Sequence, residues 1–249
     1  MSQPEPHLRH PAVAACSSAE LRARVLEQAR REPAPTRVEL TAQNGVVMGA
    51  AMLIPLLVFF LAGGVRSAPR PNRLVLETAV GSALLAVGFA AVGLGRGRSM
   101  LGRARARLLT VVLGAPVLLF AWRELVSARY PNMMVEWTER PGLRCFCLSL
   151  ALSMAPLVGA LWTRWETDPV HPRVTAAVLA AIVGAGAWVL VDLWCPVGYV
   201  PHVLFGHVTP LILLMAGSAL FGGRLLALRA RAKNSLDVGP PDRRPLGMQ

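Results

Sequence analysis

Apolar residues along this chain gather in long runs that charged residues rarely interrupt. Each run has about twenty residues, the length of α-helix that crosses roughly 30 Å of hydrocarbon. A soluble amphipathic helix would place polar residues on one face at every turn or two, and these runs do not. The runs cover approximately residues 45–65, 74–95, 108–126, 145–162, 174–195 and 203–223. The pattern predicts an all-α, polytopic membrane protein with six transmembrane helices.

Two polar and basic segments flank the apolar region. Residues 1–44 are rich in Pro and Arg and show no apolar core behind a basic start, so we expect no cleavable signal peptide. Residues 224–249 end in the Pro-rich sequence VGPPDRRPLGMQ and are expected to be disordered. We therefore predict an N-terminal tail at 1–44, a six-helix transmembrane domain at 45–223 and a basic C-terminal tail at 224–249.

The positive charge is distributed unevenly between the two sides of the predicted bundle. The chain has a formal net charge of +12. If the six segments alternate in direction, one side holds both tails and the loops 96–107 and 163–173, and only seven of the 26 Lys and Arg residues fall on the other side. Since Lys and Arg near helix ends favour the cytoplasmic side, we expect both termini in the cytoplasm. Topology and anionic lipid thus account for the charge, and we expect no direct binding of nucleic acid.

Three of the four cysteines lie at the side that is expected to face outward. Cys145 and Cys147 begin the fourth apolar segment, Cys195 ends the fifth, and Cys16 lies alone in the N-terminal tail. Thiols outside a bacterial inner membrane meet oxidising conditions, in which disulfides persist. Cys195 with either Cys145 or Cys147 is therefore a candidate disulfide or switchable dithiol. The alternative is that these cysteines are small apolar residues of membrane helices without a chemical role.

Two histidines and an aspartate accompany these thiols. His202 and His207 flank the start of the sixth segment, and Asp192 lies one turn before Cys195. Thiolate and imidazole together suit zinc or copper. However, five residues of α-helix would turn His207 off the face of His202, and the spacing matches no closed zinc site. We therefore expect no bound metal and no cofactor, and regard these residues as candidates for sensing a signal.

Further ionisable residues occur at the same depth of the bundle. Glu77 lies in the second segment and Arg123 in the third, both near the outward-facing boundary, where water reduces the cost of a charge. We expect Arg123 to pair with Glu77 or with Asp192. A pocket for a ligand or a signal, formed by the same groups, is the alternative.

The N-terminal tail contains one predicted helix, with the sequence SSAELRARVLEQARR. Its first residues fit a capping box, in which Glu20 follows a serine by the required spacing. Leu21, Val25 and Leu26 then lie within one arc of the helix. Because so short a helix is marginal alone in water, this arc needs a surface to bury against. A partner protein, the lipid bilayer and the protein's own loops are the candidates.

The six segments, the short cytoplasmic tail with one helix and the outward-facing cysteines resemble the NrsF/CarR-type membrane anti-sigma factors of bacteria. The resemblance implies a regulator of the bacterial inner membrane that is not an enzyme. It would bind an extracytoplasmic-function sigma factor through Leu21, Val25 and Leu26, and release it on an outer signal read by Cys195 with Cys145 or Cys147. One departure is that the residues before Cys195 read VDLW, without the expected histidine beside the thiol.

Two other functions use the same residues. A small transporter or metal exporter would employ the outward-facing Cys, His and Asp side chains, although we find no internal repeat and no midplane charge. A membrane thiol oxidoreductase would need an attacking and a resolving cysteine, commonly spaced Cys-x-x-Cys, whereas Cys145 and Cys147 are separated by a single residue. Both functions remain alternatives to the regulator at this point.

Overall fold

A computed structural model of the chain divides into two units, Met1–Gln43 and Asn44–Gln249, and the second holds the apolar helices from residue 44 onward. The residues that the structure describes are 23, 26–27, 37–65, 71–94, 104–130, 142–164, 170–195 and 197–226. Every regular element within these ranges is helical. The predicted all-α class is therefore confirmed for the described part of the chain.

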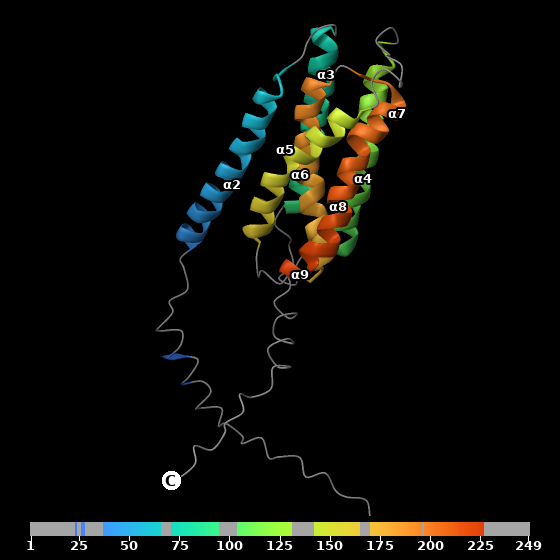
Figure 1. Cartoon of the computed structure of the whole chain (residues 1–249). Helices are drawn as coiled ribbons and strands as arrows, with labels where there is room; N and C mark the ends of the chain where they lie inside the picture. Colours follow the sequence, from blue (N-terminus) through green and yellow to red (C-terminus); the bar gives the residue numbers. More distant parts are fainter. Residues whose placement is uncertain are drawn as a thin grey trace, which may run out of the picture. The chain divides into compact units, whose positions relative to one another are not determined.

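The helices follow one another in the order of the apolar runs (Figure 1). The first five are α2 (Arg37–Leu61), α3 (Asn72–Leu94), α4 (Arg105–Ser127), α5 (Leu143–Trp162) and α6 (Pro172–Trp194). The last is composite and consists of α7 (Val200–Val203), η2 (Leu204–Val208), α8 (Thr209–Gly217), η3 (Ser218–Gly222) and α9 (Gly223–Leu226). Six of these stretches are long and apolar enough to cross a membrane. This confirms the six predicted segments, whose ends differ by a few residues, and indicates a multi-pass membrane protein.

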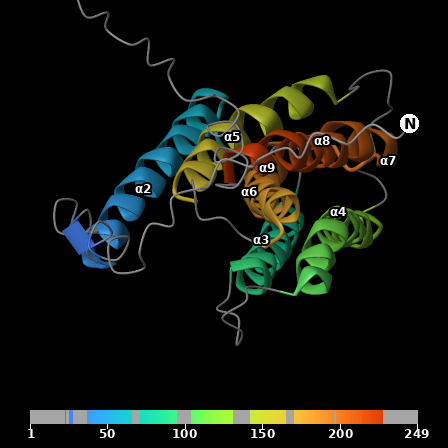
Figure 2. The ribbon, with the colours of Figure 1, turned by 90° about the horizontal axis from the view of Figure 1, so that it is seen from below.

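Helix α6 occupies the centre of the bundle. It contacts α3, α4, α5 and α8, and Figure 2 shows it between α3 on one side and α5 with α8 on the other. Of its apolar span, 61% of the residues are buried, compared with 17% in α2. The polar residues at the end of α6 therefore lie among several helices at once.

Small residues along α6 allow these close contacts. Its buried face includes Ala176, Ala177, Ala180, Ala181 and Ala185, which leave room for neighbouring backbones. A Cβ atom added at Gly184 would lie 2.5 Å from Leu211 Cδ1, so a larger residue there would force the Leu211 side chain of α8 to move.

Helix α2, unlike α6, exposes large apolar side chains on one face. Leu53, Leu57 and Phe60 project outward with 60–69% of their surface exposed, a pattern suited to contact with lipid tails. On its other face α2 approaches α5, where a Cβ at Gly159 would meet the Ala51 side chain at 2.8 Å. Trp194 Nε1 also donates a hydrogen bond of 2.9 Å to the Ala62 carbonyl beyond the end of α2.

The last membrane span contains a π-helical turn, η2, for a reason that can be traced to Pro210. Proline has no N–H, so it cannot donate the usual hydrogen bond to the Gly206 carbonyl four residues earlier. Ser149 Oγ of α5 donates to that carbonyl instead, at 3.4 Å. The N–H of Thr209 bonds to the Leu204 carbonyl five residues back, which is the π-helical pattern.

Most of the predicted N-terminal helix lies outside the described residues, including Leu21 and Val25. Of its predicted apolar arc, only Leu26 is described, and it is helical and 54% exposed. Cys16 and the C-terminal tail beyond residue 226 also lie outside the described part. The assigned limits of the two tails thus remain predictions.

Candidate functional site

Two cysteines and two histidines meet at the end of the bundle where α7 is labelled in Figure 1. Cys145 lies in the first turn of α5, Cys195 directly follows α6, His202 lies in α7 and His207 in η2. All four side chains are buried, and one possible metal-ligand atom from each lies within 4.8 Å of all the others. We call these four residues the thiol–imidazole cluster.

His202 joins the two thiols of the cluster. Its Nε2 atom lies 3.4 Å from Cys145 Sγ and 3.1 Å from Cys195 Sγ, and both cysteines are free thiols. The resemblance led us to expect a histidine in the residues before Cys195. The structure supplies the imidazole from seven residues after it, across the turn that joins α6 to α7.

Two glycines allow α5 to approach the last membrane span closely enough to form the cluster. Gly142 has a φ of 86°, in the left-handed region that favours glycine, and a Cβ there would lie 3.2 Å from the His202 carbonyl oxygen. A Cβ at Gly206 would lie 3.1 Å from Cys145 Cβ. Side chains at these two positions would separate Cys145 from His202 and from η2.

The π-helical turn brings His207 to the same side as His202. In an α-helix a separation of five residues rotates the second side chain by about 500°, that is, well away from the first. In a π-helix the hydrogen bond spans five residues, so side chains at this separation lie near one another. The two imidazole centroids are 5.9 Å apart. Our prediction that the two histidines diverge is therefore wrong, and the argument against a metal that rested on it fails.

A second group of polar side chains surrounds Asp192, which is fully buried. Ser82 Oγ and Trp188 Nε1 donate hydrogen bonds of 2.8 Å and 3.1 Å to its Oδ2 atom. Arg123 Nη1 lies 3.3 Å from its Oδ1 atom, and Arg123 Nη2 donates to the Val197 carbonyl at 3.1 Å. We call Asp192, Arg123, Ser82 and Trp188 the aspartate network.

The aspartate network decides between the two ion pairs that the sequence left open. Arg123 pairs with Asp192 and is itself only 2% exposed. Glu77 instead contacts Arg73 at 2.9 Å and Arg129 at 3.6 Å near the surface. The two candidate acidic residues thus belong to different environments, one buried among α3, α4 and α6 and one half-buried beside exposed arginines.

His207 lies between the aspartate network and the thiols. Its Nδ1 atom is 4.0 Å from Asp192 Oδ1, and its ring packs edge to face with Trp188 at a centroid distance of 5.2 Å. Neither ring nitrogen has a hydrogen-bond partner among the residues that the structure describes. A buried polar atom left without a partner costs about 1–3 kcal/mol, so this histidine has a bonding capacity that its protein surroundings do not fill.

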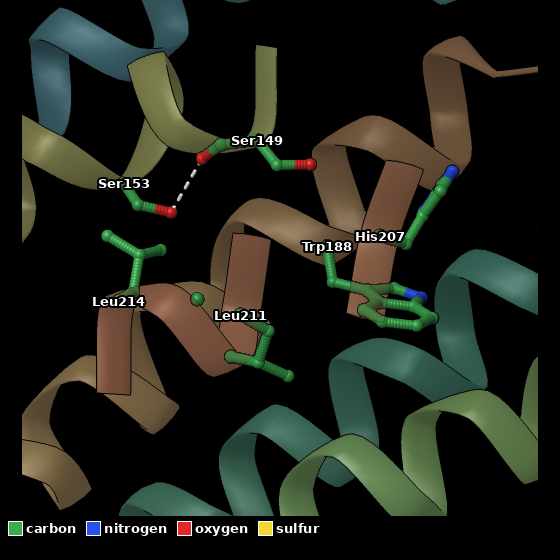
Figure 3. A pocket seen from close by; sticks show the side chains of 7 residues that line it. Ser149, Ser153, Trp188, His207, Leu211 and Leu214 are labelled. Carbon is green, nitrogen blue, oxygen red and sulfur yellow. Dashed lines mark hydrogen bonds between the residues drawn. The ribbon is translucent and has the colours of Figure 1, made fainter. Parts of the chain in front are cut away.

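A small cavity adjoins His207 and Trp188 (Figure 3). Its volume is about 10 Å³, enough for about one water molecule. Ser149 and Ser153 of α5 line another side, and Ser153 Oγ donates to the Ser149 carbonyl at 2.7 Å, the dashed line in Figure 3. The cavity is too small for an organic ligand and leaves the four cluster residues as the chemically distinctive feature.

The structure separates the sequence-predicted residues into two groups. Cys145, Cys195, His202 and His207 converge in the cluster, and Asp192 contacts its edge through His207. Cys147 is exposed and does not belong to the cluster. The geometry therefore favours Cys145 over Cys147 as the neighbour of Cys195.

Sequence reasoning missed the residues that position the cluster. Ser82, Ser149 and Trp188 hold Asp192 and η2 in place, and Gly142 and Gly206 permit the close approach. The one usable signal was Pro210, because a proline inside a membrane helix requires a local change of hydrogen bonding. It did not reveal which side chain would donate the replacing hydrogen bond.

The cluster can support two kinds of chemistry. An external oxidant that accepts two electrons can join the two thiols of the cluster as a disulfide, because the neighbouring imidazole can take up a thiol proton and the thiolate is the reactive form. Two sulfur and two nitrogen atoms in close proximity also form the donor set of tetrahedral zinc centres. Both reactions would change the contacts among α5, α6 and the last membrane span.

Comparison with known proteins assigns the chain to a family. No curated protein and no solved structure matches it. Residues 23–227 match the family described as negative regulator of sigma F, a region that includes all six membrane spans and the whole cluster. The description implies that a sigma factor is the partner and that the protein regulates transcription. The chain belongs to the NrsF family of negative regulators of sigma factors.

Proposed function

We propose that this protein is a membrane-bound anti-sigma factor that senses a signal at the thiol–imidazole cluster. It holds an extracytoplasmic-function sigma factor at its cytoplasmic N-terminal tail and releases it when the signal alters the cluster. It acts by binding and catalyses no reaction. The observation that carries the proposal is the burial of two free thiols and two imidazoles at one end of a bundle that matches a family of sigma-factor regulators.

Charge supports the placement of the cluster on the outer side of the bacterial inner membrane. With both termini in the cytoplasm, the turns that follow α2, α4 and α6 face outward. The cluster lies where α5 begins and where α6 ends, so it belongs to this side. The loops with most of the Lys and Arg residues then face the cytoplasm, as the positive-inside rule requires.

The contacts of the cluster support its coupling to the rest of the bundle. It joins α5, the end of α6 and the last membrane span, while the aspartate network next to it joins α3, α4 and α6. Because α6 is the central helix, a changed distance between Cys145 and Cys195 would alter packing along several helices. A shift of this kind would reach the cytoplasmic ends of the helices.

The predicted tail helix supplies the partner-binding surface. Leu21, Val25 and Leu26 share one arc, and the match to the family begins within this helix, at residue 23. Leu26 is exposed in the structure, which leaves it accessible to a partner. A sigma factor that buries this arc would supply the surface that a short isolated helix lacks.

The proposal is tested by purifying the detergent-solubilised protein from its own host, with and without residues 1–44. We expect an extracytoplasmic-function sigma factor to co-purify with the full chain and to be absent after truncation. A variant with Leu21, Val25 and Leu26 changed to Ser tests the arc itself, and a change of the nearby Gln28 to Ala serves as a matched control. If no sigma factor co-purifies before or after exposure of the cells to stress, the proposal is wrong and transport is to be assayed instead.

A further inference from the structure

We propose that the thiol–imidazole cluster binds one Zn²⁺ ion as a tetrahedral centre with two cysteine and two histidine ligands. The inference deepens the proposed function and rests on it for its biological meaning, since zinc would then be what holds the sensing end together. The binding itself depends only on the four side chains. It can therefore be tested without any transcriptional readout.

The distances within the cluster fit the ion. With Zn–S bonds of about 2.3 Å and Zn–N bonds of about 2.0 Å, tetrahedral geometry places sulfur and nitrogen about 3.5 Å apart and two sulfurs about 3.8 Å apart. The observed distances from His202 Nε2 are 3.4 Å to Cys145 Sγ and 3.1 Å to Cys195 Sγ. All four ligand atoms lie within 4.8 Å of one another, so small side-chain rotations complete the tetrahedron.

The second, independent observation is the unfilled bonding capacity of His207. Its side chain is buried, and neither ring nitrogen has a hydrogen-bond partner among the described residues. A metal ion at the centre of the cluster supplies a partner for one nitrogen. Asp192 Oδ1, 4.0 Å from Nδ1, is close enough to hold the histidine after a small shift, as carboxylates do beside many metal-bound histidines.

Charge also favours a divalent ion at this buried position. Two cysteine thiolates balance the charge of Zn²⁺, and neutral imidazoles add none, so the complete centre is neutral. A neutral centre avoids the large cost of an isolated charge in a poorly hydrated environment. The neighbouring Arg123 is already paired with Asp192 and does not need the thiolates as partners.

The donor set favours zinc over the hard cations Mg²⁺ and Ca²⁺. Mg²⁺ and Ca²⁺ prefer oxygen ligands, and sulfur with imidazole in a tetrahedral arrangement is typical of zinc. Four protein ligands leave no open position for substrate, which is the pattern of structural rather than catalytic zinc. The proposed ion would thus fix α5, α6 and the last membrane span relative to one another.

The test measures zinc in the purified full-length chain, in detergent with a reducing agent and with an affinity tag that contains no histidine. This tag matters because His7 and His10 of the chain's own tail already offer sites for adventitious zinc. We expect about one zinc per chain in the wild type and less than about a tenth of this after Cys145→Ser or Cys195→Ser, because each change removes a ligand. The matched control is Cys147→Ser, which changes an exposed thiol two residues along α5 and should keep its zinc.

Cobalt replacement in the wild type provides a measurement that does not depend on the folding of any variant. Co²⁺ added to the wild type after zinc removal should give the strong visible bands of tetrahedral coordination and thiolate-to-metal charge transfer in the near ultraviolet. His207→Ala should alter or remove these bands while Cys147→Ser preserves them. A wild type that contains neither zinc nor a cobalt spectrum would overturn the proposal, as would equal zinc in all the cysteine variants or a stable Cys145–Cys195 disulfide under reducing conditions.

The outcome separates this inference from the proposed function. If the sigma factor co-purifies but zinc is absent, the regulator stands and the zinc site fails. If zinc is present at the cluster but no sigma factor is held, the zinc site stands and the regulator fails. Each failure is visible in its own assay.

Discussion

The thiol–imidazole cluster and the aspartate network are two neighbouring buried polar groups that differ in what their central side chains contact. In the network, the carboxylate of Asp192 receives hydrogen bonds from Ser82 and Trp188 and a guanidinium from Arg123. In the cluster, four donor atoms point toward one small volume and His207 has no hydrogen-bond partner within the described residues. A buried carboxylate that protein groups of several helices hold specifies how those helices pack, whereas a buried imidazole without a hydrogen-bond partner indicates a ligand or a reaction.

Their positions explain why both groups lie at the same end. Asp192 lies one turn before Cys195, which directly follows α6, so the residue that holds the central helix and one thiol of the cluster belong to the same segment. His207 contacts both groups. The aspartate network can therefore hold the thiol–imidazole cluster in place while its own bonds remain intact. Variants in the two groups should accordingly differ in what they damage.

The largest expected effect is loss of stability on removal of the buried negative charge. Asp192→Asn keeps the shape of the side chain but leaves the Arg123 guanidinium buried without its counter-charge, which should cost about 3–5 kcal/mol in the free energy of unfolding. Equilibrium unfolding in mixed micelles measures this change. Glu77→Gln is the control, since its partners Arg73 and Arg129 are largely exposed and such pairs contribute less than about 1 kcal/mol.

A double variant sharpens this prediction. Asp192→Asn combined with Arg123→Gln removes both charges, so its cost should be smaller than the sum of the two single changes. Additive costs in the double variant would show that the two residues do not stabilise each other. The ion pair of the aspartate network would then not be what holds these helices together.

The next effect concerns the approach of α5 to the last membrane span. Gly142→Ala forces a Cβ into a left-handed backbone conformation and toward the His202 carbonyl, at a cost of about 1–2 kcal/mol. It should also reduce zinc binding, since it displaces His202. Gly186→Ala is the control: a Cβ there meets no atom within 4 Å, so it should be neutral or slightly stabilising in its helix. Equal effects of the two changes on zinc content and unfolding would contradict the account of Gly142.

These cases show how far the sequence alone leads. The six membrane spans and the candidates Asp192, Cys145 and Cys195 were predictable, because hydropathy sets the spans and their alternating direction sets which helix ends share a side. The convergence of His202 with His207 was not, since it depends on a π-helical turn. That turn arises from Pro210 together with a hydrogen bond from Ser149, which belongs to a different helix. Periodicity within one segment cannot report a bond supplied by another.

The choice between Cys145 and Cys147 was unpredictable for a similar reason. Both begin the same helix and differ by two residues, so only the rotation of α5 about its axis separates them. That rotation is fixed by contacts with the last membrane span, including the close approach of Gly206 to Cys145. The sequence placed both thiols at the correct depth but could not say which one faces Cys195.

A smaller effect should follow from loss of one hydrogen bond to the network. Ser82→Ala removes the 2.8 Å bond to Asp192 while Trp188 and Arg123 remain in contact with the carboxylate. Side-chain hydrogen bonds between membrane helices contribute about 0.6 kcal/mol on average and at most about 1.7 kcal/mol. The same unfolding assay should therefore show a cost in this range, well below that of Asp192→Asn. A larger cost would mean that the serine, and not the ion pair, dominates the network.

The last and smallest expected effect is a difference in the rate at which the thiols of α5 are alkylated. The protein is treated with N-ethylmaleimide in detergent after metal has been removed with a chelator, and mass spectrometry follows each cysteine with time. Cys147 is exposed and should react first, while Cys145 and Cys195 are buried and react only when the helices separate. A separation free energy of only about 1.4 kcal/mol already slows modification tenfold. Because zinc is absent in this experiment, the difference in rate between Cys147 and Cys145 depends on the packing of α5 and not on the ion.

Gly142→Ala should reduce this difference in rate by loosening the first turn of α5, whereas Gly186→Ala should leave the difference unchanged. Equal rates at Cys145 and Cys147 in the wild type would mean that the first turn of α5 does not hold the rotation on which the cluster depends.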